Sequence, residues 1–558
     1  MKYAILAAVL LATSLSAHAQ VPPRSGSQMQ QIPPAPVPQK SIPEIRVEPS
    51  GAPALPGSDN VRFPVRTLQI TGQTLYSEAD LLAVSGFIPG GDVSLADLRG
   101  IAARIADHYH RNGYIVAQAY LPAQDIKDGS VTIAVLEGRY GKVNLNNQSK
   151  LRNSQATGLL EGLNSGDPIA IAPLENRLLL LSDTPGVVVK STLVPGAAVG
   201  TSDLNVDVTD GRLVTGSVEA DNAGNRYTGE YRVGASVYLH NALGLGDLGG
   251  LRVITSGSGL TYGRGFYQVQ AGKFTLGAAY SALEYKLGKE FKDLQAHGTA
   301  EVASLYASYP LIRSRNTNLN AMVGYDLRTY QDRIDAPPAS VTDKTANVWM
   351  ASLYGNHRDG FGGGGLSSFS LTLSAGDLDI QTPAALAIDQ ATARTNGSYG
   401  KLAYSASRLQ TLSDRWSLFA GINGQFASKN LDISEKMSLG GPYAVRAYPV
   451  GEAYADEGYV VNLEARYRLP KFSDRMPGEM YLIGFVDTGS VTTFANPWFT
   501  GPNHRTLSAT GLGVNWVDYN NFTLSAYWAH KLGNDRATSV PASVDSSSRF
   551  WVQAVKYF

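Results

Sequence analysis

The feature that most constrains this chain is the pattern that begins after Arg212. Helical periodicity disappears there, and short segments alternate apolar with small or polar side chains between turns rich in Gly, Asn and Asp. In segment 369–375, the apolar residues fall on one face and Ser370, Thr372 and Ser374 on the other. Because side chains of a strand alternate between its faces, this pattern predicts many strands with one apolar and one polar face.

Two architectures are built from such strands, a soluble sandwich and a transmembrane barrel. A signal peptide over residues 1–19 is predicted by Lys2, by the apolar stretch after it, and by Ala17 and Ala19, which form an A-x-A cleavage signal. Export and the aromatic residues at the ends of the strands favour the barrel. We therefore predict a transmembrane β-barrel over residues 213–558, with about 16 antiparallel strands.

The region between the signal peptide and the barrel contains an internal repeat. The order strand, helix, helix, strand, strand occurs over residues 63–139 and again over 140–212, which predicts two small α+β modules in tandem. Residues 20–62 precede them and are rich in Pro, as in an extended linker. Within this region, residues 25–32 could form one or two helical turns, although eight residues alone would be marginal as a helix in water.

Composition narrows the range of partners. Lys plus Arg and Asp plus Glu both number 47, so the chain lacks the positive charge expected of a nucleic-acid-binding protein. The sequence has no Cys, which excludes a disulfide and a thiolate metal site. His108 and His110 lie two apart on a predicted helix and point to different faces, which argues against a shared metal. We expect no cofactor.

The string FVDTGS at 485–490 raises the alternative of an aspartic protease with Asp487 as a catalytic carboxylate. That chemistry requires two carboxylates that share a proton. A second copy of the motif is absent from the sequence, and the nearest string, at 182–186, has Pro where the turn requires Gly. We therefore prefer a reading in which the chain is not an enzyme.

Two strings carry a resemblance to a known family. VRAY stands at 445–448 within LGGPYAVRAYPVGEAYADEGYVVNLEARYRLP, and FVDTG stands at 485–489. With two modules followed by a barrel, they resemble the TpsB family, the outer-membrane transporters of two-partner secretion that export haemagglutinins, haemolysins and adhesins. The matching residues are Val445, Arg446, Ala447 and Tyr448 in the loop motif and Phe485, Asp487 and Gly489 in the strand motif.

The resemblance implies a specific architecture and function. The two modules would be periplasmic POTRA domains, and the barrel would have 16 strands in the outer membrane of a Gram-negative bacterium. Residues 25–32 would be the helix that plugs the barrel in the family, and we expect it to be loosely held because it is short. The chain would be a monomeric pore, in contact with outer-membrane lipid, that translocates an unfolded exoprotein such as an adhesin, haemolysin or haem-binding protein. Ala447 stands where the family usually has Gly, which would strain the loop if that position required positive φ. The alternative function is a barrel-assembly factor of the BAM type, which shares POTRA domains and the loop motif.

Two functional contacts are expected from the residues themselves. A carboxylate on the lipid face of a strand is costly, so Asp487 should point into the lumen with Phe485. Arg446, on a loop that the family folds into the barrel, is its expected partner. A strand of the second module, rich in β-branched residues, is expected to present an unpaired edge to which an extended segment of the exoprotein adds. That candidate edge consists of Val187, Val188, Val189, Lys190, Ser191, Thr192 and Leu193.

Overall fold

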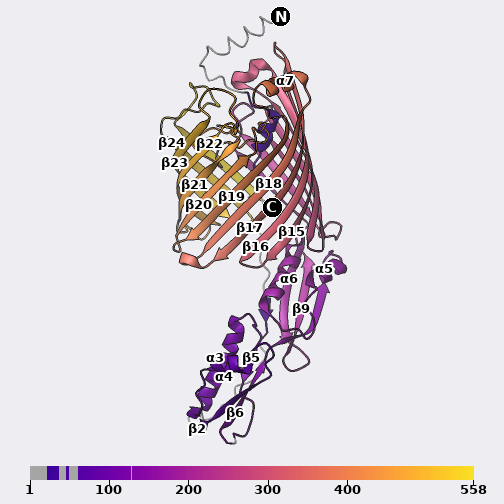
Figure 1. The fold of residues 1–558 in the computed structure, drawn as a ribbon, viewed down its shortest axis with the longest axis vertical. Coiled ribbons are helices and arrows are strands. Elements are labelled where there is room, and N and C mark those ends of the chain that lie inside the picture. Colours follow the sequence, from indigo (N-terminus) through magenta and orange to yellow (C-terminus); the bar gives the residue numbers. More distant parts are fainter. Residues whose placement is uncertain (1–21, 37–44, 49–60, 127) are drawn as a thin grey trace.

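The computed structural model describes residues 22–36, 45–48, 61–126 and 128–558. The predicted signal peptide and most of the Pro-rich linker lie outside these ranges. Figure 1 shows two small modules at one end of an elongated molecule and a large barrel at the other. No helix in the described part of the chain is both long and apolar enough to cross a membrane.

The first module packs two helices against a small sheet. Ser77 and Ser94 cap the helices by accepting hydrogen bonds from the backbone N–H of Asp80 and Asp97. The sheets have the orders β3-β6-β5 and β2-β4, so the single strand expected from residue 63 is two short strands with different partners. The elements are β2 (Arg62–Val65), β3 (Thr67–Thr71), α3 (Glu78–Ser85), β4 (Gly91–Ser94), α4 (Leu95–Arg111), β5 (Gln118–Tyr120) and β6 (Ser130–Leu136).

The second module repeats the order strand, helix, helix, strand, strand. Leu174, Leu178 and Leu181 of its longer helix are buried against the sheet, where they form the centre of its core. This helix spans Ile171–Asp183. The elements are β7 (Arg139–Asn147), α5 (Asn153–Leu160), α6 (Ile171–Asp183), β8 (Val187–Pro195) and β9 (Thr201–Asp210).

The expectation of an unpaired edge along β8 is wrong for part of that strand. A short segment of the linker, β1 (Ile45–Val47), pairs in parallel with Ser191, Thr192 and Leu193 and gives the sheet order β1-β8-β9-β7. The N–H of Glu48 extends the contact by donating to the carbonyl of Leu193 at 3.0 Å. The linker covers this edge because an exposed strand leaves backbone groups unpaired.

The second module is attached to the near end of the barrel. Asp183 and Glu175 of α6 form ion pairs with Arg313 at 2.6 Å and Arg315 at 2.7 Å, beside the turn between β15 and β16. The N–H of Arg152 donates to the carbonyl of Gly244 in another turn at 3.0 Å. These contacts hold the sheet of the second module just below the barrel opening (Figure 1).

A closed antiparallel barrel follows, and β10 and β25 complete the ring. The described residues contain 16 barrel strands, as predicted. The strands are β10 (Val214–Asp221), β11 (Arg232–His240), β12 (Leu248–Thr255), β13 (Leu260–Ala271), β14 (Phe274–Lys286), β15 (Ala296–Arg313), β16 (Thr317–Ile334), β17 (Ser340–Asp359), β18 (Gly365–Ile380), β19 (Gly397–Thr411), β20 (Trp416–Ala427), β21 (Glu457–Arg468), β22 (Glu479–Thr492), β23 (His504–Asp518), β24 (Phe522–Leu532) and β25 (Ser548–Tyr557).

The connections at the two ends of the barrel differ. Most turns near the modules are short, and one of them contains η2 (Phe361–Gly363). The far end has longer loops with η1 (Lys289–Leu294) and α7 (Pro383–Ala391), and α7 lies at the top of Figure 1. On β18, Leu371 and Leu373 are 43% and 58% exposed, so the apolar face predicted for this strand points outward.

A short helix, α2 (Ser25–Gln30), lies inside the barrel against β14, β15 and β16. Its N-terminal residues are buried, and the N–H of Ser25 donates to Asp332 of the wall at 2.8 Å. The side chain of Gln28 accepts from Thr228 at 2.8 Å. The helix therefore has more contacts than the loose attachment expected from its length.

Candidate functional site inside the barrel

The connection between β20 and β21, residues 428–456, folds back into the barrel. Bridges between Met437 and Ala455 and between Gly440 and Val445 give this loop a compact form. Leu439 and Val445 are fully buried in a cluster with apolar residues from the strand wall. We call residues 428–456 the inner loop.

Arg446 of the inner loop and Asp487 of β22 are brought together in this cluster. The Arg446 Nη2 and Nε atoms lie 2.7 Å and 2.8 Å from the two carboxylate oxygens of Asp487. The backbone N–H of Arg446 donates to the same carboxylate at 3.1 Å. Asp487 is fully buried and Arg446 is 4% exposed. This is the bidentate geometry in which a guanidinium binds a carboxylate most strongly.

The remaining groups of Arg446 are also engaged. Its Nη1 lies 2.8 Å from Glu464 on β21, and its Cζ lies 3.5 Å from the centre of the Phe485 ring. The indole N–H of Trp551 on β25 donates to the Arg446 carbonyl at 2.7 Å. One loop residue thus contacts three strands and makes ion-pair, cation–π and backbone interactions.

Asp487 is part of a hydrogen-bonded network and not of a proton-sharing dyad. Asn462 donates to its carboxylate at 2.7 Å and to the Ala444 carbonyl at 2.9 Å, so it also joins wall and loop. The second carboxylate in the network, Glu464, lies on the far side of the guanidinium. This arrangement holds a buried charge in place and is unlike the paired carboxylates of an aspartic protease.

The other motif residues help to seat the loop. Ala447 is fully buried and is not among the described residues with positive φ, so Ala at this position causes no backbone strain. The Tyr448 ring is buried, with Lys531 Nζ 4.8 Å from its centre. A Cβ at Gly489 would lie 2.7 Å from Leu439 Cδ2, so the absence of a side chain allows the loop to approach β22.

The inner loop has further ionic anchors that sequence reasoning missed. Glu435 forms ion pairs with Arg328 of β16 and, at 2.7 Å, with Lys401 of β19. Asp432 pairs with Lys344 of β17 at 2.7 Å. The sequence shows acidic residues in this loop, but no local pattern identifies the basic residues with which they pair.

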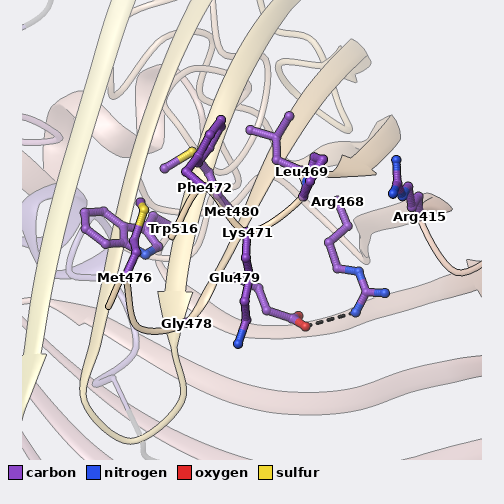
Figure 2. A pocket seen from close by; sticks show the side chains of 11 residues that line it. Arg415, Arg468, Leu469, Lys471, Phe472, Met476, Gly478, Glu479, Met480 and Trp516 are labelled. Atoms are coloured by element: carbon purple, nitrogen blue, oxygen red, sulfur yellow. Dashed lines mark hydrogen bonds and ion pairs between the residues drawn. The ribbon is translucent and has the colours of Figure 1, made fainter. Parts of the chain in front are cut away.

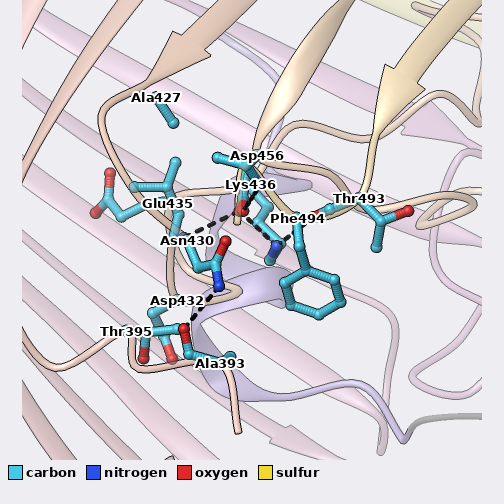
Figure 3. A network of polar contacts seen from close by, with 12 residues as sticks. Ala393, Thr395, Ala427, Asn430, Asp432, Glu435, Lys436, Asp456, Thr493 and Phe494 are labelled. Atoms are coloured by element: carbon cyan, nitrogen blue, oxygen red, sulfur yellow. Dashed lines mark hydrogen bonds and ion pairs between the residues drawn. The ribbon is translucent and has the colours of Figure 1, made fainter. Parts of the chain in front are cut away.

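Figure 3 shows another polar network at the base of the loop. Lys436 pairs with Asp456, donates to the Thr493 carbonyl at 2.7 Å, and lies 4.2 Å from the centre of the Phe494 ring. Asn430 donates at 2.8 Å to the Ala393 carbonyl, which lies beyond α7. The network therefore ties the inner loop to two outer loops.

Glu452 secures the opposite side of the loop. Its carboxylate is fully buried and pairs with Arg505 of β23. The backbone N–H groups of Thr538 and Ser539 donate to it at 2.8 Å and 2.9 Å. The inner loop is thus fastened to several sides of the barrel by charged groups.

The helix α2 fills part of the lumen beside the inner loop. A Cβ at Gly26 would lie 2.5 Å from Cβ of Ser434, so the absence of a side chain permits this contact. Gln30 and Gln31 donate to the Ser434 carbonyl and the Tyr454 hydroxyl, respectively. All of these contacts are between uncharged groups, in contrast to the anchors of the loop.

The described residues provide no group of three or more His, Asp or Glu arranged to hold a metal ion. His108 packs its ring against Tyr76 with centres 4.8 Å apart, and the His110 ring lies 2.8 Å from the Ala117 carbonyl. Each histidine therefore has a local structural contact.

Comparison with known proteins agrees with this architecture. Residues 200–516 match the family model described as haemolysin secretion/activation protein ShlB/FhaC/HecB, and residues 63–138 match the ShlB-type POTRA domain. The heme/hemopexin transporter protein HuxB of Haemophilus influenzae is 30% identical over 511 residues, which cover 89% of this chain and 88% of HuxB.

Two solved structures share the fold. CdiB from Escherichia coli has a TM-score of 0.67 and 18% identity, with coverage of 91% of this chain and 93% of CdiB. BamA from Haemophilus ducreyi lacking POTRA domains 1–3 has a TM-score of 0.53 and 15% identity, with coverage of 89% and 100%. The family models, the HuxB match and the observed fold together show that this chain belongs to the ShlB/FhaC/HecB family of outer-membrane secretion proteins.

Proposed function

We propose that an exoprotein first adds as an extended strand to the sheet of the second POTRA module, at the edge of β8 that β1 covers. The chain is a two-partner secretion transporter of the outer membrane, with its POTRA region in the periplasm. The observation that carries the proposal is the pairing of Ile45–Val47 with Ser191, Thr192 and Leu193. At this edge, the linker forms the same kind of extended strand that an unfolded exoprotein would form.

The pairing of β1 is short enough to be exchanged. Only three residues of β1 are paired, and Val187 to Lys190 of β8 have no partner on this side among the described residues. A longer extended segment would form more backbone hydrogen bonds along the same edge. Backbone pairing depends little on sequence, so side chains beside the edge would provide the preference for one exoprotein.

Passage through the barrel requires space in a lumen that holds α2 and the inner loop. The anchors of the loop include the buried ion pairs of Arg446, Glu435 and Glu452, whereas α2 is held by hydrogen bonds and by no ion pair among the described residues. Breaking a buried ion pair leaves two unpaired charges, which costs more than exchanging single hydrogen bonds such as those of Ser25 and Gln28 for hydrogen bonds with water. We therefore propose that α2 leaves the lumen while the inner loop remains as the lining of the path.

The identity of the exoprotein is part of the proposal. HuxB is named as a heme/hemopexin transporter, so the first candidate to test is a haem- or hemopexin-binding exoprotein encoded near this chain. We propose that the barrel acts as a monomeric pore, carries out no catalysis, and extends from about residue 213 after POTRA modules over 63–139 and 140–212.

To test this function, the chain and that exoprotein are expressed together in a Gram-negative bacterium that has neither protein of its own. The full chain should release the exoprotein into the medium, and a variant lacking residues 63–212 should insert and release none. Release by the bare barrel would contradict the proposed capture. A general loss of other barrel proteins from the outer membrane when this chain is deleted would instead indicate the BAM-type function.

A further inference from the structure

A pocket of about 280 Å³ lies at the periplasmic rim of the barrel, beneath the turn that joins β21 to β22. It is lined by this turn, by the ends of β21, β22 and β23, and by Arg415 from the preceding turn (Figure 2). The inner loop and the POTRA modules contribute no residue to it. The pocket is therefore separate from the translocation site described above.

One side of the pocket is apolar and aromatic. Figure 2 shows Phe472, Met476, Met480 and Trp516 gathered on the left of the view. The indole N–H of Trp516 donates to the Pro477 carbonyl at 2.9 Å, so its polar edge is engaged. Aromatic residues with this amphipathic character mark the boundary between the hydrocarbon and the headgroups of a membrane.

The other side of the pocket is cationic. Arg415, Arg468 and Lys471 line it, and the only acidic lining residue, Glu479, pairs with Arg468 at 3.0 Å. Arg415 donates to the Tyr467 hydroxyl at 3.3 Å, and neither Arg415 nor Lys471 forms an ion pair with a described residue. Three cations, Arg415, Arg468 and Lys471, therefore share one acidic residue, Glu479, and the lining has a net positive charge.

We propose that this pocket binds a glycerophospholipid of the periplasmic leaflet through its anionic headgroup phosphate. Arg415 and Lys471 would hold the phosphate, since guanidinium and ammonium groups form charge-assisted hydrogen bonds with its oxygens. The acyl chains would lie along the outer wall, where Leu482 and Leu512 are 45% and 64% exposed. The net positive lining favours phosphatidylglycerol over the zwitterionic phosphatidylcholine.

The test uses the full chain in nanodiscs of phosphatidylcholine that contain a small fraction of brominated lipid. Bromine quenches the fluorescence of a nearby tryptophan. Because the chain has six Trp residues, the fluorescence of Trp516 is taken as the difference between the fluorescence of the unmodified chain and that of Trp516→Phe. Brominated phosphatidylglycerol should quench this signal at a concentration on the order of tenfold lower than brominated phosphatidylcholine.

The double variant Arg415→Gln with Lys471→Gln should lose the preference for phosphatidylglycerol over phosphatidylcholine. The control Lys273→Gln with Lys292→Gln removes the same charge away from the pocket and should retain it. Equal quenching by the two lipids in the unmodified chain, or an unchanged preference in the pocket variant, would overturn the proposal. Displacement of the lipid by millimolar inorganic phosphate would also overturn it, because the pocket would then be a site for free anions.

Discussion

Arg446 and Asp487 stand 41 residues apart in the sequence and form a buried bidentate ion pair between the inner loop and β22, with N–O distances of 2.7 Å and 2.8 Å. The pair determines where the loop sits, because the Arg446 backbone N–H binds the same carboxylate. The position of the loop thus depends on an interaction that requires both residues.

Replacing either partner should release this part of the loop. Arg446→Ala and Asp487→Ala each leave a buried group without its partner, at a cost of roughly 3 to 5 kcal/mol. Each variant should insert normally and secrete poorly, and the double variant should be little worse than either single variant. Secretion and insertion are measured in the same cells, and additive losses would show that the two residues act separately.

A control variant and a charge swap also test the role of the Arg446–Asp487 pair. Arg408→Ala breaks a bidentate but partly exposed pair with Asp359 near the periplasmic ends of the strands and should secrete nearly normally. Exchanging Arg446 and Asp487 should not restore secretion, because the new aspartate would face Glu464, which lies 2.8 Å from the Arg446 guanidinium. Full recovery by the swap would contradict the role assigned to Glu464.

Gly489 should be intolerant of a side chain. In Gly489→Ala, the added methyl would meet Leu439 at 2.7 Å and the Tyr459 carbonyl at 3.0 Å, which should destabilise the seated loop by about 1 to 3 kcal/mol. Leu439→Ala in the same chain should recover part of the loss. Gly484→Ala on the same strand has its nearest contact at 3.9 Å and serves as the control. Protease protection of the inner loop measures the effect, and equal protection of Gly489→Ala and the control would refute the prediction.

The contact between Gly26 and Ser434 predicts a change in channel conductance. A side chain in Gly26→Val has no space against Ser434, where even a Cβ would lie 2.5 Å away, so α2 should leave the lumen. Planar-bilayer recordings should show a higher conductance while secretion continues. Gly263→Val is the control because a Cβ there meets nothing within 4 Å. Unchanged conductance after Gly26→Val would show that α2 does not obstruct the pore.

The first POTRA module should lose stability at acidic pH through Glu137. Burial raises the pKa of Glu137, but hydrogen bonds from Thr74, Leu75 and Tyr109 outweigh burial and lower the pKa below its ordinary value of 4.5. A lowered folded-state pKa contributes stability above pH 4.5, and that stability is lost as pH falls through the folded-state value.

Glu137→Gln should therefore destabilise the module at pH 7 by about 1 to 3 kcal/mol and have a smaller effect in acid. Circular dichroism at 222 nm during heating follows the helices, to which the barrel contributes little. If the difference in stability between the unmodified chain and Glu137→Gln stayed constant from pH 7 to pH 3, the proposed linkage would be contradicted.

The sequence predicted the local elements well, because their signals are local. The alternation in segment 369–375 gives the outward apolar face of β18, and the capping residues Ser77 and Ser94 give the starts of α3 and α4. The pairing of Arg446 with Asp487 could also be expected, since a buried carboxylate in the lumen requires a cation.

Contacts set by three-dimensional arrangement were not predictable in the same way. The anchors at Glu435 and Glu452 join the inner loop to distant strands, and nothing near them in the sequence identifies their partners. The cover of β8 by Ile45–Val47 depends on a linker segment that has no strong strand pattern. The pocket beside Trp516 arises only when adjacent turns meet at the rim.

If the exoprotein is captured at the edge of β8, that edge must be free. The chain contains no Cys, so the register partners Arg46 and Thr192 can be replaced by the only two cysteines, which should form a disulfide that locks β1 onto β8. The control pair Asn144→Cys with Asn205→Cys links β7 to β9 in the same sheet and leaves the edge of β8 unaffected.

The decisive measurement is the amount of exoprotein released into the medium by each cross-linked variant before and after mild reduction. We expect the disulfide of the variant Arg46→Cys with Thr192→Cys to block release and reduction to restore it, whereas the control pair should secrete normally in both states. Normal release by the oxidised, fully cross-linked variant would contradict capture at this edge.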